Sequence, residues 1–196
     1  IAANDYEVHT EKGLVHCRFR GKLKRERSGA TKLAAVGDQV EVTPGEAEQG
    51  TIEKVLPRRS RLSRHDVMHP SREQVIIANV DFLFVVQAAM DPDFNDLIVD
   101  KCTVMAATNS LPLVLVVNKS DLARPDLSVY EKAGYRCVRT STKTGEGVEE
   151  IRTFLKGRTS VFIGPSGVGK SSLLNALEPG LGLKVGAVSK RGDGRH

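Results

Sequence analysis

Polar and apolar residues alternate in short runs over the first 65 residues, a pattern typical of strands with one buried face. Clusters of glycine, proline and aspartate separate these runs and indicate turns. The predicted strands are Tyr6–His9, Gly13–Arg20, Gln39–Val42 and Gly50–Leu56. Four or five short strands in about 60 residues favour a small all-β barrel of the OB type, a class that often binds nucleic acid.

The pattern changes after residue 72, where apolar residues form nearly continuous runs of strand length. Such runs are expected for strands that are buried on both faces of a sheet. They occupy Asn79–Val86, Leu113–Val117 and Ser160–Ile163.

Two segments between these runs carry apolar residues at helical spacing. In the first, the predicted apolar face consists of Leu97, Lys101, Val104, Met105 and Thr108. In the second, it consists of Val148, Ile151, Phe154 and Leu155. Strands that alternate with helices predict βαβ units, so this part of the chain is predicted to be an α/β domain with a mostly parallel sheet.

These patterns divide the 196 residues into a first domain over 1–66, a linker over 67–72 and a second domain over 73–196. Charged residues make up 27% and hydrophobic residues 40%, which excludes a disordered chain. No apolar run approaches the roughly 20 residues of a membrane span, and no secretory leader is recognisable. The three cysteines form no CxxC pair, so we expect a reducing, cytoplasmic environment.

The net charge of +5 belongs mostly to the first domain, since residues 1–72 hold 14 Lys and Arg against 10 Asp and Glu. Clustered basic side chains neutralise phosphates and release counterions, so an RNA-binding role is predicted for two clusters. An alternative is that each cluster is only a solvated turn or linker. The residues concerned are Arg18, Arg20, Lys22, Lys24, Arg25, Arg27, Arg58, Arg59, Arg61 and Arg64.

The strongest motif is Gly164–Ser171, which matches GxxxxGK[ST] at every fixed position. It lies between a predicted strand and a helix-compatible stretch, as a phosphate-binding loop requires. Backbone N–H groups and the helix N-terminus are predicted to bind phosphate, with Lys170 on the β- and γ-phosphates and Ser171 on Mg²⁺ as the catalytic pair. The predicted contacts are Gly164, Pro165, Ser166, Gly167, Val168, Gly169, Lys170, Ser171 and Ser172.

A second motif, Asn118-Lys119-Ser120-Asp121, matches the NKxD motif of the GTPase superfamily. The Asp121 carboxylate is suited to accept the N1–H and exocyclic amino group of guanine, whereas adenine leaves it unpaired. Asn118 can bridge the base and the phosphate loop, and the Lys119 stem can cover the base. The segment Ser141-Thr142-Lys143 resembles the next GTPase motif, Ser-Ala-Lys, with Thr142 in place of alanine.

The order of the motifs is permuted, because the base-reading motifs precede the phosphate loop. Such a permutation is plausible where domain termini lie close together at the surface. With a basic all-β domain in front, this order resembles the ribosome small subunit-dependent GTPase A family over essentially the whole chain. Further segments that resemble the family are Asn79–Asp81, Val86–Ala89, Thr144–Gly147 and Gly192–His196.

The resemblance implies a monomeric GTPase that uses GTP and Mg²⁺ and releases GDP and phosphate. It further implies stimulation by the small ribosomal subunit and a role in late 30S maturation through binding of ribosomal RNA. The family also carries a second switch and a C-terminal zinc domain. We find neither motif here, so we expect this chain to be part of a longer protein whose zinc ligands lie elsewhere.

Two alternatives of different class stay open at this point. A nucleotide kinase could use the same phosphate loop, which also resembles those of guanylate kinases and transporter ATPases. The other alternative is an RNA-binding module in which the nucleotide domain is only a scaffold. Affinities for GDP and ADP separate the first alternative from a GTPase, and stimulation by ribosomal subunits tests the second.

Overall fold

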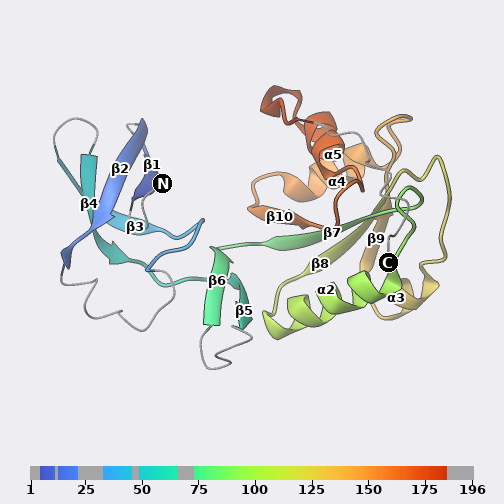
Figure 1. Ribbon diagram of the computed structural model, residues 1–196, viewed down its shortest axis with the longest axis horizontal. Coiled ribbons are helices and arrows are strands. Elements are labelled where there is room, and N and C mark those ends of the chain that lie inside the picture. Colours follow the sequence, from blue (N-terminus) through green and yellow to red (C-terminus); the bar gives the residue numbers. More distant parts are fainter. Residues whose placement is uncertain (1–4, 12, 22–32, 46–48, 66–72, 185–196) are drawn as a thin grey trace, which may run out of the picture. The chain divides into compact units, whose positions relative to one another are not determined.

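The computed structural model describes residues 5–11, 13–21, 33–45, 49–65 and 73–184 (Figure 1). Its internal contacts divide the chain into two compact units, residues 1–79 and residues 80–196. Each unit has its own sheet and its own buried residues. The two units are therefore described separately.

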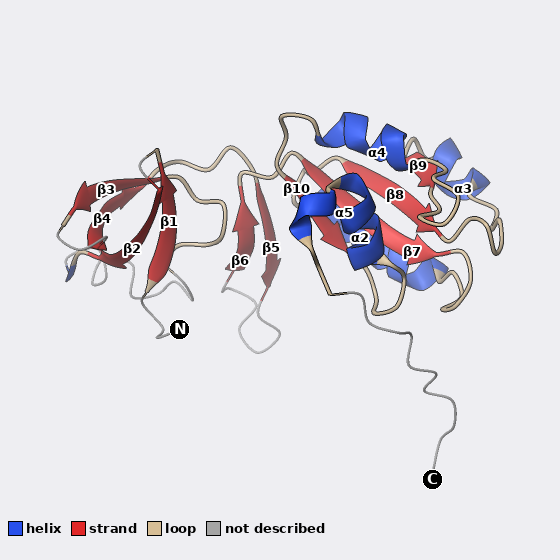
Figure 2. Cartoon of the chain, turned by 90° about the horizontal axis from the view of Figure 1, so that it is seen from above, coloured by secondary structure: helices blue, strands red, loops and turns tan. Residues whose placement is uncertain are grey.

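The first unit is all-β and holds a four-stranded sheet with the strand order β1-β2-β4-β3 (Figure 2). Strands β2 and β4 are parallel, and the other two pairs are antiparallel. Its strands are β1 (Tyr6–Thr10), β2 (Gly13–Phe19), β3 (Val40–Pro44) and β4 (Gln49–Val55). A separate antiparallel pair is formed by β5 (Arg61–His65) and β6 (Glu73–Ala78). Each of the four predicted strands has its counterpart in the sheet.

The alternating pattern of these strands gives the sheet one buried and one exposed face. On β2, Cys17 is buried while its neighbours His16 and Arg18 are exposed. Ile52 on β4 is 1% exposed and belongs to the buried face. Strand periodicity of two produces this division, since successive side chains point to opposite faces.

A buried ion pair fixes the turn that precedes β3. Arg58 donates two hydrogen bonds to the carboxylate of Asp38, at 2.6 and 2.7 Å, and the Asp38 side chain is only 1% exposed. Beside it, Gly37 has a φ of +85°, and a Cβ there would lie 2.3 Å from the Ala78 carbonyl oxygen. The turn therefore packs directly against β6, and only glycine fits at its closest approach.

The second unit has a four-stranded parallel sheet in the order β10-β7-β8-β9. Helices α4 and α5 cover one face, and α2 and α3 the other (Figure 1). The strands are β7 (Phe82–Ala88), β8 (Leu113–Asn118), β9 (Arg136–Arg139) and β10 (Ser160–Ile163). The helices are α2 (Asp96–Thr108), α3 (Ser128–Lys132), α4 (Val148–Leu155), α5 (Lys170–Leu177) and the 3-10 turn η1 (Pro179–Leu181). Among the described residues, no helix is long and apolar enough to cross a membrane.

Two of the three apolar runs predicted as doubly buried strands, those of β7 and β8, form the centre of this unit. The third run forms β10, which lies at the edge of the described sheet with all four residues half-buried, so the prediction of a doubly buried strand was wrong there. All six residues of β8 are buried, and Phe84 of β7 stacks on Phe162 of β10 with ring centroids 4.7 Å apart. The predicted face of α4 packs on the same core, with Ile151 fully buried. Burial of these side chains provides most of the favourable free energy of folding.

The structure differs from the predicted face of α2. Leu97 and Val104 are 61% and 65% exposed, and Val99 and Ala106 are buried instead. This helix has apolar residues on more than one side, so their spacing alone does not identify the side that faces the sheet. The prediction of that face from periodicity was wrong.

The division between the units also differs from the predicted boundary at residue 73. Strand β6 pairs with β5, and its residues belong to the first unit, which extends to Asn79. The sequence pattern places Glu73–Ala78 in the second domain, because it does not reveal the antiparallel pairing of this segment with β5. The predicted linker, residues 67–72, lies outside the described residues.

Replacing Arg58 by alanine is expected to destabilise the first unit by about 3 kcal/mol, since a buried carboxylate loses its partner. Urea unfolding of the Arg58→Ala variant measures this effect. Arg18→Ala is the matched control, because Arg18 is 79% exposed in its pair with Asp5 and should leave the midpoint nearly unchanged. Equal midpoints for the two variants would contradict a structural role for the Arg58–Asp38 pair.

Candidate functional site

The predicted phosphate loop leaves the end of β10 and enters α5, as its motif requires. Three of its glycines, Gly164, Gly167 and Gly169, have positive φ values of 152°, 82° and 90°. A Cβ on Gly164 would lie 2.1 Å from the carbonyl oxygen of Val86 on the neighbouring strand β7. Backbone conformation and close packing therefore both require glycine in this loop.

Lys170 begins α5, and its side chain reaches back across the loop. Its ammonium donates hydrogen bonds to the carbonyl oxygens of Gly164, at 2.8 Å, and Pro165, at 2.5 Å. Burial lowers the pKa of Lys170, because removal from water disfavours the charged form. The two hydrogen bonds hold the ammonium group at the loop itself, where an anion bound to the backbone N–H groups would contact it.

Asn118 connects the phosphate loop to the loops of the second motif. It lies at the end of β8 and is 1% exposed. Its amide donates to the carbonyl oxygen of Val168 at 2.9 Å, and its side-chain oxygen accepts from the Thr140 hydroxyl at 3.1 Å. A Cβ on Gly169 would lie 2.3 Å from the Asn118 amide nitrogen, so this contact also needs glycine.

Asp121 and Ser141 come from different loops and meet through a short hydrogen bond. The Ser141 hydroxyl donates to Asp121 Oδ1 at 2.6 Å and accepts from the backbone N–H groups of Lys143 and Thr144. This hydrogen bond lowers the pKa of Asp121, and the charges of Lys143 and Lys119 act in the same direction. Asp121 is therefore held as a carboxylate, the form that accepts two hydrogen bonds.

Lys119 has a φ of +59°, and its ammonium donates to the carbonyl oxygen of Asp91 in the loop after β7. Thr142 and Lys143, which follow Ser141 in the chain, are exposed, and the Lys143 ammonium lies 4.0 Å from the Asp121 carboxylate. Ser166 is exposed, whereas Ser171 and Ser172 are half-buried in the first turn of α5. Hydrogen bonds thus link residues of both predicted motifs, which are more than 40 positions apart.

Three residues that were not among the predicted site residues connect the same loops. The Glu146 carboxylate accepts a hydrogen bond from the Ser120 hydroxyl at 2.6 Å and another from Arg124 at 2.7 Å. Ser120 occupies the variable position of the NKxD motif and gave no signal in the sequence. Glu146 was noted only as part of the Thr144–Gly147 resemblance.

The basic residues of the first unit have different surroundings. Arg18 and Arg20 are mostly exposed, and each pairs with one carboxylate, Asp5 or Glu53, at 2.6 and 2.7 Å. Arg58 is engaged with buried Asp38, and Arg59 donates to the backbone oxygen of Asn79. Lys22, Lys24, Arg25 and Arg27 lie outside the described residues, as does the side chain of Arg64. Arg61 lies on β5 and is exposed.

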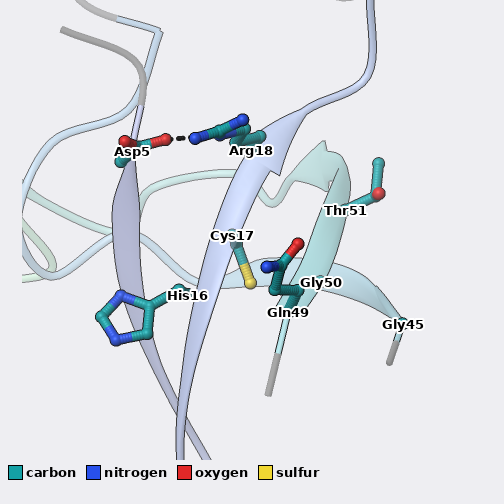
Figure 3. Close-up of a pocket in the computed structure, with 8 residues that line it drawn as sticks. All are labelled: Asp5, His16, Cys17, Arg18, Gly45, Gln49, Gly50 and Thr51. Atoms are coloured by element: carbon teal, nitrogen blue, oxygen red, sulfur yellow. Dashed lines mark hydrogen bonds and ion pairs between the residues drawn. The ribbon is translucent and has the colours of Figure 1, made fainter. Parts of the chain in front are cut away.

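An open pocket lies along β2 and β4 in the first unit (Figure 3). Figure 3 shows the Arg18–Asp5 ion pair at one end and His16 and Gln49 near the other. The residues that line it are Asp5, His16, Cys17, Arg18, Gly45, Gln49, Gly50 and Thr51. Among the described residues that line the pocket, Arg18 is the only member of the predicted basic clusters, and Asp5 is the one acidic residue.

Two family models match the chain. The model described as RsgA GTPase matches residues 55–196, and the RsgA N-terminal domain matches residues 3–52. The chain is similar to relatives that carry the name "Small ribosomal subunit biogenesis GTPase RsgA", of which two serve as examples. The relative from Caldanaerobacter subterraneus is 39% identical over 99% of this chain, and that from Gemmatimonas aurantiaca is 42% identical over 97%. The chain spans 63% and 65% of the lengths of these two relatives.

The solved structures that are similar to this chain include those of YjeQ and YloQ. YjeQ from Thermotoga maritima matches with a TM-score of 0.70 and 38% identity, over 94% of this chain and 64% of its own. YloQ, described as a circularly permuted GTPase, matches with a TM-score of 0.64 and 27% identity, over 92% of this chain and 62% of its own.

Replacing Asn118 by alanine is expected to cost about 1–3 kcal/mol of stability, because the buried Val168 carbonyl and Thr140 hydroxyl lose a partner. Chemical unfolding followed on the second unit measures this loss. Thr140→Val removes the hydrogen bond between Thr140 and Asn118 from its other end. The double variant should therefore lose less stability than the sum of the two single variants. Strictly additive losses would contradict the bridging role of Asn118.

Proposed function

This chain belongs to the RsgA GTPase family, and on that premise we propose that it binds GTP and hydrolyses it to GDP and phosphate. The predicted fold class is confirmed: a circularly permuted GTPase domain with a parallel sheet follows a small all-β unit. The observation that carries the proposal is the hydrogen-bonded connection from the phosphate loop through Asn118 to the loop that holds Ser141 and Asp121.

Guanine selectivity is proposed to come from Asp121. Its ionised carboxylate offers acceptors for the N1–H and the 2-amino group of guanine, and Ser141 orients it through one oxygen. Adenine carries no hydrogen on N1 and no 2-amino group, so a bound adenine would leave the carboxylate oxygens unpaired. The Lys119 stem is proposed to cover the base, while the backbone N–H groups near Thr142 and Lys143 face its carbonyl oxygen.

The phosphates are proposed to bind in the loop from Gly164 to Gly169, at the N-terminus of α5. Lys170 would then exchange its hydrogen bonds to the loop carbonyls for the β- and γ-phosphate oxygens. The Ser171 hydroxyl, in the next position of the helix, would hold Mg²⁺ together with these oxygens. When bound, the metal neutralises charge that develops on the transferred phosphoryl group.

The partner is proposed to be the small ribosomal subunit and its RNA, and the role late 30S maturation in the cytoplasm. The names of the relatives, which refer to small-subunit biogenesis, support this proposal. The exposed Arg18 and Arg20 support the all-β unit as the RNA-binding part. We further propose a monomer whose GTP hydrolysis the subunit stimulates.

Zinc stays a prediction from the family resemblance. Within the part of the chain that the structure describes, no group of three or more His, Cys, Asp or Glu side chains is arranged to hold a metal ion. The predicted Mg²⁺ site differs in kind, because it depends on one hydroxyl and on phosphate oxygens of the nucleotide itself.

Substituting Asp121 by asparagine should change the preferred base from guanine to xanthine. The asparagine amide can donate to the 2-oxo group of xanthine but not to the 2-amino group of guanine. Isothermal titration of GDP, XDP and ADP measures the exchange. We expect at least a tenfold loss of GDP affinity, given about 1.5–3 kcal/mol for hydrogen bonds to a charged group. Affinity for XDP should rise.

Lys170→Ala is the matched control for this exchange, because it should weaken all three nucleotides without changing their order. Equal affinities of the wild-type chain for GDP and ADP would refute guanine recognition and favour a kinase-like use of the loop. Stimulation of hydrolysis is tested separately with the full-length protein and purified 30S subunits.

Replacing Arg18 and Arg20 together by alanine should weaken binding to 30S subunits. The slope of log affinity against log salt concentration should become less steep by about one to two. Binding measured between low and physiological salt gives this slope. Arg136→Ala is the control, because Arg136 is similarly exposed, at 61%, but lies in the second unit beside Glu150. A double variant with an unchanged slope would exclude these arginines from the RNA contact.

A further inference from the structure

Two loops at the carboxyl ends of β8 and β9 hold the residues proposed to read the base. The first loop runs from Asn118 to Arg124 and contains Asp121. The second runs from Thr140 to Gly147 and contains Ser141. The relative position of these loops decides where the Asp121 carboxylate meets a base.

One side chain of the second loop contacts the first loop on both sides of Asp121. Glu146 Oε2 accepts the Ser120 hydroxyl at 2.6 Å, and Oε1 accepts Arg124 at 2.7 Å. Ser120 is 4% exposed, and the Glu146 side chain is 34% exposed. The Ser120 hydrogen bond, followed by that of Arg124, lowers the pKa of Glu146, so the group is a carboxylate with both oxygens in use.

The backbone of Glu146 is itself fixed within its loop. Its carbonyl oxygen accepts the N–H of Ser141 at 3.0 Å, which closes the loop at the residue that contacts Asp121. Gly147 has a φ of +67°, and a Cβ there would lie 2.0 Å from the carbonyl oxygen of Arg139. Glu146 therefore projects from a backbone with little freedom, so its carboxylate can set the position of what it binds.

We propose that Glu146 is a positioning residue for guanine recognition, which holds the loop from Asn118 to Arg124 so that both oxygens of Asp121 face the base edge. Ser141 orients Asp121 by direct contact, whereas Glu146 acts one step away, through the residues on either side. This inference rests on the proposed guanine-binding function and names a further determinant of its specificity.

The proposal makes a specific claim about the base rather than the phosphates. Guanine offers Asp121 two donors, and hypoxanthine, which lacks the 2-amino group, offers one. Two parallel hydrogen bonds need a stricter orientation of the carboxylate than one does. A small displacement of Asp121 should therefore affect GDP more than IDP, and the ratio of their affinities reports the alignment.

The experiment measures GDP and IDP affinities by calorimetry for the wild-type chain and for Glu146→Gln. Glutamine has the same shape but replaces one carboxylate oxygen by an NH2 group, so it cannot accept from Ser120 and Arg124 on two separate oxygens as Glu146 does. We expect GDP affinity to fall about tenfold, IDP affinity to fall less, and the GDP-to-IDP ratio to decrease about threefold to fivefold.

Two further variants complete the experiment. Glu150→Gln is the matched control, because Glu150 is a nearby carboxylate on α4 that pairs with Arg136, outside the two loops, and the ratio should stay at the wild-type value. Ser120→Ala removes one of the two contacts with a minimal change of volume. It should lower the ratio in the same direction, and adding it to Glu146→Gln should cause less than the sum of the two effects.

The outcomes are distinguishable. A ratio that Glu146→Gln and Ser120→Ala both leave unchanged would overturn the positioning role, as would equal losses for GDP and IDP. If Glu146→Gln does not fold, Ser120→Ala alone gives the answer, because a wild-type ratio in that variant also overturns the proposal. A wild-type chain that fails to prefer GDP over ADP would instead refute guanine binding itself.

Discussion

The buried amide of Asn118 is the interaction on which the candidate site depends. It lies at the end of a fully buried strand and bonds on one side to the phosphate loop and on the other to Thr140. Because a buried polar group without a partner is costly, this geometry holds three loops in one arrangement. The close contact is possible because Gly169 has no side chain, since a Cβ there would lie 2.3 Å from the Asn118 amide nitrogen.

The parallel sheet explains how distant segments reach the same place. In a parallel sheet the carboxyl ends of all strands lie at one edge, where loops from β10, β8 and β9 meet. The order of these strands along the chain has no influence on that edge. A permuted sequence therefore builds the same site as an ordinary one, provided that the strands keep their neighbours.

Sequence patterns predicted much of this architecture and missed specific parts for physical reasons. The four strands of the first sheet and the face of α4 follow from periodicity, and strands β7, β8 and β10 follow from continuous apolar runs. The face of α2 does not, because that helix is apolar on several sides. Arg58 belongs to a basic run predicted to contact RNA, and its pairing with buried Asp38, 20 positions away, is a contact that the run does not predict.

The sequence by itself determined which chemistry is expected of the candidate site, since the phosphate loop and the NKxD motif are local and each requires particular residue types at fixed spacing. Only the tertiary structure decided how those motifs are held together. Glu146 lies 26 positions from Ser120, and Asn118 lies 50 from Val168. No spacing rule connects such positions, because their contacts arise from strands that become neighbours only when the sheet forms.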